Sequence, residues 1–265
     1  MIKTRVITGA VLGIALVLTV LFLSTPLMAA ILGVLWVIGA WEWAGLALLG
    51  SAARLAYAAA CAAGMVVALL WAGADAAFVI LVLALAWWVL AFIVVLTYPR
   101  KFPMSTVGIV GFVVLLPSWF LFARLHGSGP LGHQLAMTVL AIVWAADVGA
   151  YTFGRWLGRV KLAPAVSPGK TWEGVGGGVL VAAAAAWAAA LLLGLPAAAM
   201  IGIGTATALV SVVGDLAVSV FKRNVGLKDT GTLLPGHGGV MDRIDSLTAA
   251  IPIFVLGLKA AGLTS

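Results

Sequence analysis

The chain has 265 residues, of which 64% are hydrophobic and 9% are charged, and its mean hydropathy is +1.22. Soluble domains carry about 25% charged residues, so the composition excludes a soluble fold and indicates that the bilayer acts as solvent for much of the surface. The net charge of +7 suggests nucleic-acid binding at first sight. In a membrane protein, however, Lys and Arg more often mark cytoplasmic loops, so we expect no nucleic-acid partner.

Long unbroken apolar runs predict an all-α integral membrane protein, because the strands of a membrane barrel would alternate every second residue. The basic start of the first run resembles a signal peptide, but we expect a retained helix because its apolar run is long enough to span. We expect one polytopic domain over residues 1–265, with N-terminal helices in 1–140 and catalytic helices and loops in 141–265. Pro, Gly, Ser and charged residues separate nine predicted spans, at about 6–24, 27–49, 53–72, 76–97, 104–125, 134–154, 175–194, 197–221 and 246–263.

The basic residues divide unevenly between the two sides of these spans. With the N-terminus inside, only Arg124 and Lys259 fall on the outer side. This bias predicts a cytoplasmic N-terminus and an external C-terminus. We also expect a place in the cell inner membrane. The thirteen basic residues on the inner side are Lys3, Arg5, Arg54, Arg100, Lys101, Arg155, Arg159, Lys161, Lys170, Lys222, Arg223, Lys228 and Arg243.

Two acids lie inside predicted spans near their cytoplasmic ends. Glu42, between two Trp residues, is interpreted as a side chain that reaches the membrane interface among aromatic anchors. Asp147 shares one face of the sixth predicted helix with Tyr151 and Arg155. Either Arg155 neutralises this carboxylate, or Asp147 lines a cavity.

The loop before the seventh span combines a lysine, hydroxyl groups and glycines. Gly169-Lys170-Thr171 resembles the end of a P-loop, but the first glycine of that motif would fall at Pro164, and a membrane helix follows. A lysine and hydroxyls before a helix N-terminus still form a natural phosphate site. The glycines either allow a ligand to approach or only permit close helix packing. The substrate-binding candidates are Ser167, Lys170, Thr171 and Glu173, and the glycines are Gly174, Gly176, Gly177 and Gly178.

Asp215 lies in the eighth predicted span, about 10 Å from its cytoplasmic end at 1.5 Å per residue. A carboxylate in the membrane is costly, at about 2.5–3.5 kcal/mol on insertion scales, and indicates a functional site. The alternative is a buried ion pair that serves packing. Asp215 belongs to a polar stripe on one helical face, formed by Ser211, Asp215, Ser219 and Lys222.

Charged residues and glycines continue through the loop that follows and into the ninth span. Asp242 and Asp245 lie three residues apart near the start of that helix, where one of them could simply cap it. Together with Asp215 they could instead hold Mg²⁺, which takes one or two carboxylates plus phosphate and water oxygens. Basic side chains here would bind phosphates, glycines would let the backbone approach a ligand, and His237 is a base, a phosphate donor or a turn residue. These residues are Lys222, Arg223, Lys228, Arg243, Gly236, Gly238 and Gly239.

The region combines carboxylates that could hold a metal with basic side chains that could bind phosphates, and it contains no obvious nucleophile. This combination fits phosphoryl or nucleotidyl transfer. Several motifs in residues 145–250 closely resemble the phosphatidate cytidylyltransferases, also called CDP-diacylglycerol synthases. Asp147-x3-Tyr151-x2-Gly154-Arg155 and Ser167-Pro168-x-Lys170-Thr171-x-Glu173-Gly174 are similar to motifs of that family. The most specific match is Ser219-x-Phe221-Lys222-Arg223-x4-Lys228-Asp229-x-Gly231-x2-Leu234-Pro235-Gly236-His237-Gly238-Gly239-x2-Asp242-Arg243-x-Asp245.

The resemblance implies that CTP and phosphatidate react to give CDP-diacylglycerol and pyrophosphate at the cytoplasmic face. It also implies Mg²⁺ on Asp215 and Asp242, with K⁺ as a possible second cation. Asp229 and His237 join the catalytic candidates through the same motif. A homodimer is left open. Two other functions remain possible: a CTP-dependent polyprenol or phytol kinase, which needs a base for a neutral hydroxyl, and a transporter, for which sites at the bilayer midplane are expected.

Overall fold

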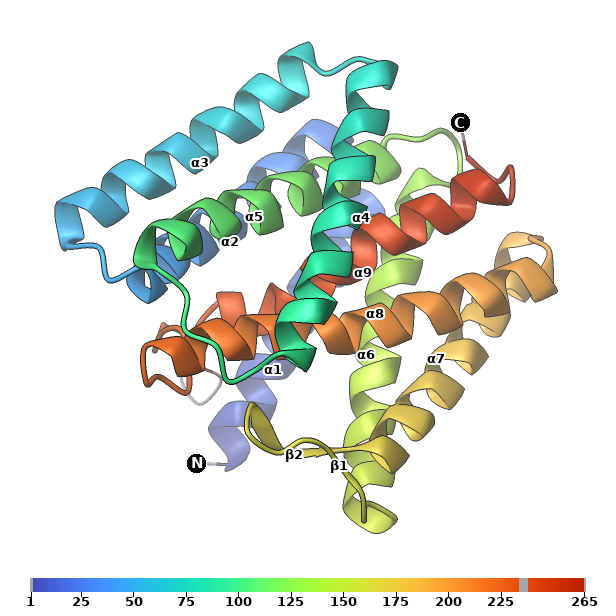
Figure 1. The fold of residues 1–265 in the computed structure, drawn as a ribbon. Helices are drawn as coiled ribbons and strands as arrows, with labels where there is room; N and C mark the ends of the chain where they lie inside the picture. The colour runs from blue at the N-terminus through green and yellow to red at the C-terminus, as the bar shows by residue number, and fades with distance from the viewer. Residues whose placement is uncertain (1, 234–237, 265) are drawn as a thin grey trace.

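The computed structural model describes residues 2–233 and 238–264, with side chains from residue 9 onward. Helices dominate it (Figure 1), so the predicted all-α membrane fold is confirmed. The helices α2 to α8 are each long and apolar enough to cross a membrane. The described part contains α1 (Ile2–Phe22), α2 (Thr25–Leu46), α3 (Ser51–Trp71), α4 (Ala74–Leu96), α5 (Met104–His126), α6 (Gly132–Trp156), α7 (Trp172–Leu193), α8 (Ala197–Asn224) and α9 (Met241–Ala260).

Two features differ from the sequence prediction. First, α9 begins at Met241 rather than near residue 246, so Asp242 lies in its first turn and Asp245 in its second. Second, the loop between α6 and α7 forms a short antiparallel hairpin of β1 (Lys161–Ala163) and β2 (Ser167–Thr171). Its strands are too short to show a period-2 pattern in the sequence.

Two long connections carry many of the charged residues, one between α6 and α7 and the other between α8 and α9, and they lie on the same side of the molecule. Figure 1 shows the β1–β2 hairpin, the α8–α9 loop and the α4–α5 connection on one side, and the α3–α4 and α7–α8 connections on the opposite side. The side chain of Asn224, at the end of α8, exchanges two hydrogen bonds with the backbone of Phe102 in the α4–α5 connection, at 3.0 and 3.1 Å. These bonds fix the end of α8 where the charged segment begins.

Two of the three tryptophans of α2, Trp36 and Trp43, face the protein interior. Trp43 is fully buried, donates a 2.7 Å hydrogen bond to the carbonyl of Val107, and packs against Phe221 of α8 with ring centroids 5.4 Å apart. Trp36 donates to the hydroxyl of Ser118 at 2.9 Å. The interpretation as an interfacial anchor is therefore wrong for Trp43, whereas Trp41 is 36% exposed. The indole N–H groups of Trp36 and Trp43 both have partners inside the bundle, which lets these rings be buried.

Glycines bring α7 into close contact with α6. A Cβ on Gly178 would lie 2.7 Å from the carbonyl oxygen of Ala146, and one on Gly177 would overlap the side chain of Phe153. Gly176, by contrast, has nothing within 4 Å of its Cβ position. Small residues at a helix interface permit such close packing in membranes. Close packing thus accounts for Gly177 and Gly178, whereas Gly176 faces open space.

We expect Gly177→Ala to lower the free energy of unfolding by about 1–3 kcal/mol, because the added methyl group overpacks the α6–α7 interface. The matched control is Gly176→Ala, which adds the same methyl group to open space and removes a helical glycine. This control should leave stability unchanged or raise it by about 0.5–1 kcal/mol. The melting temperatures of both variants in detergent, compared with the native chain, test the difference. Equal melting temperatures would contradict the proposed packing.

Candidate active site

Asp215 occupies the middle of the polar stripe on α8. Its Oδ2 lies 2.7 Å from Nζ of Lys170 on β2, and its Oδ1 accepts a 3.2 Å hydrogen bond from the hydroxyl of Ser219. The side chains of Lys170 and Asp215 are 27% and 30% exposed, so a ligand can reach both. Because Ser219 follows Asp215 by four residues, the two side chains lie one turn apart on the same face of α8, as predicted. The β1–β2 hairpin places Lys170 beside this face.

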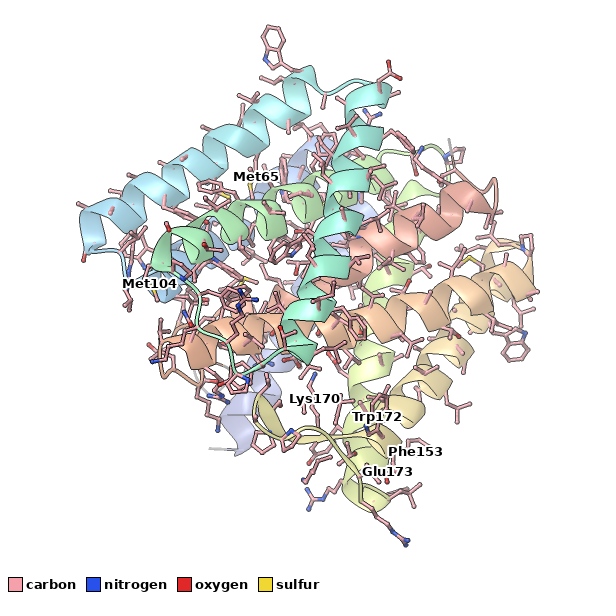
Figure 2. The ribbon with its side chains drawn as sticks, viewed as in Figure 1. Met65, Met104, Phe153, Lys170, Trp172 and Glu173 are labelled. Atoms are coloured by element: carbon pink, nitrogen blue, oxygen red, sulfur yellow. The ribbon has the colours of Figure 1, made fainter. Side chains whose placement is uncertain are left out.

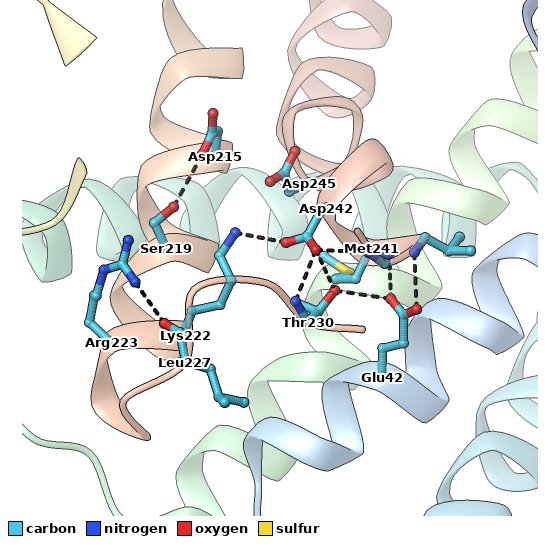
Figure 3. Close-up of polar contacts among 12 residues, drawn as sticks. Glu42, Asp215, Ser219, Lys222, Arg223, Leu227, Thr230, Met241, Asp242 and Asp245 are labelled. Carbon is cyan, nitrogen blue, oxygen red and sulfur yellow. Dashed lines mark hydrogen bonds and ion pairs between the residues drawn. The ribbon is translucent and has the colours of Figure 1, made fainter. Parts of the chain in front are cut away.

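Asp242 accepts hydrogen bonds from four donor groups (Figure 3). Nζ of Lys222 lies 2.8 Å from Oδ1 of Asp242, and both side chains are less than 10% exposed. Oδ2 accepts from the backbone N–H and hydroxyl of Thr230, at 2.9 and 3.1 Å, and from the N–H of Gly239 at 3.0 Å. The carboxylate is therefore held in one orientation, with a cation on only one of its oxygens.

Asp245 is the most enclosed of the three predicted metal ligands. The residue is 6% exposed, and its carboxylate accepts a 2.7 Å hydrogen bond from the N–H of Ser246. In the part of the chain with described side chains, no Lys or Arg lies within ion-pair distance of it. A buried carboxylate without a cation is costly. Asp245 is therefore a buried carboxyl group without a paired cation among the described side chains, beside Asp215 and Asp242.

The burial of Glu42 contradicts the interpretation that its side chain reaches the membrane interface. Glu42 is 5% exposed, and its carboxylate accepts hydrogen bonds from the start of α9 and from Thr230. It therefore belongs to the surroundings of Asp242, as Figure 3 shows. The sequence offered one signal for this role, which is a carboxylate inside an apolar span. The neighbouring Trp residues, taken as interfacial anchors, obscured it.

Two cavities meet at the carboxylates, and each combines apolar side chains with a few charged groups. The first, of about 480 Å³, lies between α6, α7, α8 and the hairpin and is lined by Lys170, Thr171 and Arg155. The second, of about 750 Å³, reaches Lys222 and Arg243 at one end. Asp147, Asp215 and Ser246 line both cavities. Apolar residues of four helices line the rest of the second cavity, namely Leu12, Leu16, Leu32, Leu35, Trp36, Phe122, Leu140 and Trp144.

The first cavity settles the alternatives for Asp147. Arg155 donates a 2.9 Å hydrogen bond to the hydroxyl of Tyr151 and forms no ion pair with Asp147. Asp147 is exposed and lines both cavities. The prediction that it lines a cavity is therefore the one that the structure supports.

Three of the predicted substrate-binding residues stabilise the segment between α6 and α7. Thr171 caps α7 by accepting a 3.1 Å hydrogen bond from the N–H of Gly174, and Glu173 accepts from the N–H of Val160 at 3.1 Å. Ser167 pairs with Ala163 across the strands. Figure 2 shows Lys170, Trp172 and Glu173 at this end of the molecule. Of the four predicted substrate-binding residues here, Lys170 and Thr171 line the first cavity.

Some of the remaining predicted residues line the second cavity, and others lie in or brace the α8–α9 loop. Asp229 and Arg243 line it, whereas Lys228 is exposed nearby in sequence. The guanidinium of Arg223 donates to the carbonyls of Val166 and Leu227, at 3.2 and 2.7 Å, and so joins the hairpin to the α8–α9 loop. A Cβ on Gly238 would lie 3.1 Å from Oδ2 of Asp242, and a Cβ on Gly239 would meet Glu42. Gly236 and His237 lie outside the described residues.

The carboxylates suit a divalent cation that is completed by substrate. Among the described side chains, no three from His, Cys, Asp and Glu stand close enough together to form a ready metal site. Asp215, Asp242 and Asp245 nevertheless line one cavity, and Asp245 lacks a cation. Mg²⁺ commonly takes one or two carboxylates together with phosphate and water oxygens. The donor set therefore fits such an ion when phosphates are present.

Comparison with known proteins gives consistent matches. A model of the cytidylyltransferase family matches residues 3–261. A phosphatidate cytidylyltransferase of Pseudomonas aeruginosa is 44% identical, over 99% of this chain and 98% of that protein. One from Haemophilus influenzae is 39% identical over 96% and 97% of the two chains, and one from Brucella suis is 41% identical over 59% and 57%.

Proposed function

The chain belongs to the cytidylyltransferase family, as its motifs predicted, and we propose that it acts as a phosphatidate cytidylyltransferase. The reaction is CTP plus phosphatidate giving CDP-diacylglycerol and pyrophosphate. One observation carries this proposal: two cavities, each lined by apolar side chains together with a few charged groups, meet at Asp147 and Asp215. A nucleotide and a lipid headgroup can then occupy neighbouring cavities and react where the two meet.

In the proposed reaction, a phosphate oxygen of phosphatidate attacks the α-phosphorus of CTP. A new P–O bond forms, the bond from the α-phosphorus to the oxygen bridging to the β-phosphate breaks, and pyrophosphate leaves. The attacking phosphate is already an anion near pH 7, so no strong general base is required. Catalysis then rests on positioning and on neutralising charge. Lys170 and Lys222 lie on the two cavities and can supply positive charge to phosphates.

Cytidylyl transfer generally uses a divalent metal, and we propose Mg²⁺ held by Asp215 and Asp242, with Asp245 beside them. When bound, it neutralises charge on the phosphate oxygens and on the leaving pyrophosphate. K⁺ as a second cation is supported by the family resemblance alone. Both carboxylates pair with a lysine in this structure, and we propose that these lysines turn to the substrate phosphates when the metal and substrate bind.

The apolar wall of the second cavity is proposed to hold the lipid. Its lining includes Leu12 and Leu16 of α1 and Leu32 and Leu35 of α2, and Leu12 is 43% exposed. An apolar wall beside charged groups suits a lipid whose headgroup reacts while its chains stay in the leaflet. Trp144, 36% exposed, belongs to the same wall. We propose that phosphatidate enters here sideways from the membrane.

The site is proposed to face the cytoplasm. The two long charged loops lie on one side of the molecule (Figure 1), and the sequence places thirteen basic residues on that side. An excess of Lys and Arg marks cytoplasmic loops. A position in the cell inner membrane follows from the same proposal, and association into a homodimer stays a prediction.

The fate of labelled phosphate tests the reaction. With phosphatidate as acceptor, we expect label from the α-phosphate of CTP to enter the lipid and label from the γ-phosphate to appear in pyrophosphate. A polyprenol or phytol kinase would place the γ-label in its lipid and no α-label there. Uptake of a solute into proteoliposomes without CTP turnover would indicate a transporter. Either result would overturn the proposal.

A further inference from the structure

A buried carboxylate from the N-terminal half of the chain reaches the proposed metal site. Glu42 lies near the end of α2, and its contacts in the site are about 190 residues away in sequence. Oε1 accepts a 3.0 Å hydrogen bond from the N–H of Val240, and Oε2 accepts one of 2.8 Å from the N–H of Met241. These N–H groups open α9 and have no partner within the helix.

The same carboxylate is linked to Asp242 through one hydroxyl group. Oγ1 of Thr230 lies 3.0 Å from Oε2 of Glu42 and 3.1 Å from Oδ2 of Asp242. A threonine hydroxyl has a single hydrogen, so the two carboxylates share one donor. The N–H of Thr230 donates to Asp242 as well, at 2.9 Å. Glu42 is therefore hydrogen-bonded both to the start of the helix that carries Asp242 and to the loop residue that donates to Asp242.

The loop closes on Glu42 at two glycines. A Cβ on Gly231 would overlap Oε1 of Glu42, and a Cβ on Gly239 would overlap both Oε2 and the hydroxyl of Thr230. Side chains at these positions would push the loop away from the carboxylate. No described Lys or Arg side chain pairs with Glu42. Backbone N–H groups and the positive end of the α9 dipole stabilise its charge instead.

We propose that Glu42 is a positioning residue for the metal site: it fixes the start of α9 and Thr230, and thereby the orientation of Asp242. This inference rests on the proposed function, because it takes Asp242 as a metal ligand. Partners that orient a ligand commonly account for a 10- to 100-fold change in metal affinity when they are replaced. Glu42 is assigned no part in the transfer itself, since the hydrogen bonds to both of its oxygens come from groups of the protein.

Glu42→Gln is the direct test. The amide keeps the size of the side chain but places an NH₂ group against backbone N–H donors, so at least one of the three hydrogen bonds is lost. We expect Mn²⁺, titrated into the purified full chain and followed by electron paramagnetic resonance, to bind about 10- to 100-fold more weakly. The KM for CTP should rise in assays at fixed Mg²⁺ and return towards the native value at high Mg²⁺.

Two further variants separate positioning from general loosening. Ser118→Ala removes a different buried hydrogen bond of α2, in which the hydroxyl of Ser118 on α5 accepts from the indole N–H of Trp36. It should lower the melting temperature and leave Mn²⁺ affinity unchanged. Thr230→Val removes only the shared hydroxyl and should weaken Mn²⁺ binding by less than Glu42→Gln does. If Glu42→Gln does not fold, Thr230→Val decides.

The outcomes distinguish this inference from the proposed function. If the native chain binds no Mn²⁺ and transfers no α-labelled phosphate, the proposed function fails. If the native chain does both, and Glu42→Gln or, where that variant does not fold, Thr230→Val binds Mn²⁺ with native affinity, Glu42 is not a positioning residue. Equal weakening by Ser118→Ala would also overturn the inference, because it would show that any loosening of α2 has the same effect.

Discussion

Asp215→Asn is expected to reduce cytidylyl transfer by on the order of 10²- to 10³-fold or more, while the protein remains folded. The amide keeps an oxygen that can accept from Ser219, so the local geometry of α8 is retained. It loses the negative charge that faces Lys170 and the proposed metal. Removal of one preorganised charge-stabilising group typically reduces turnover by this amount. Initial rates with α-labelled CTP, at saturating Mg²⁺, measure the effect.

The matched control for this variant is Asp75→Asn, which makes the same chemical change on an exposed acid in the first turn of α4. Asp75 lines neither cavity, so we expect its turnover to equal that of the native chain. Size-exclusion profiles and circular dichroism spectra should match for all three proteins. Near-native turnover of folded Asp215→Asn at saturating Mg²⁺ would show that the metal assignment is wrong.

Local periodicity made Asp215 predictable. Ser219 lies one turn away and donates to Asp215, as the spacing along α8 indicated. Boundaries of most helices were predicted for the same reason, since long apolar runs end at Pro, Gly or charge. The start of α9 was placed too late, because Asp242 and Asp245 were read as a polar loop end. Their burial comes from neighbours elsewhere in the chain.

Contacts distant in sequence set the limit of prediction. Glu42 meets Val240 across 198 residues, and no spacing rule connects them. The partners of the lysines were missed for the same reason. Lys170 and Lys222 were predicted to bind phosphates, and the structure pairs them with Asp215 and Asp242. A sequence shows which charges a site contains, but the order in which they pair depends on the fold.

The Lys222–Asp242 pair leads to a second prediction with a large effect. Replacing Lys222 should lower turnover without lowering the affinity for the metal. Lys222 is 7% exposed, and its ammonium group occupies the one oxygen of Asp242 that the backbone leaves open. We expect Lys222→Met to reduce turnover by about 10²- to 10³-fold, because the phosphates lose a cation. Mn²⁺ affinity should stay the same or increase, because no lysine competes for Oδ1.

The thermal stability of the Lys222→Met variant independently tests whether the metal replaces Lys222 on Asp242. Removing one partner of a buried ion pair commonly lowers the free energy of unfolding by about 3–5 kcal/mol, because the other charge is left unpaired. We therefore expect metal-free Lys222→Met to melt at a lower temperature, and Mn²⁺ to recover more stability in this variant than in the native chain. Lys259→Met, at the exposed end of α9, is the control and should change neither quantity. If Lys222→Met instead binds Mn²⁺ more weakly in proportion to its loss of turnover, Lys222 only supports the structure, and the metal does not replace it on Asp242.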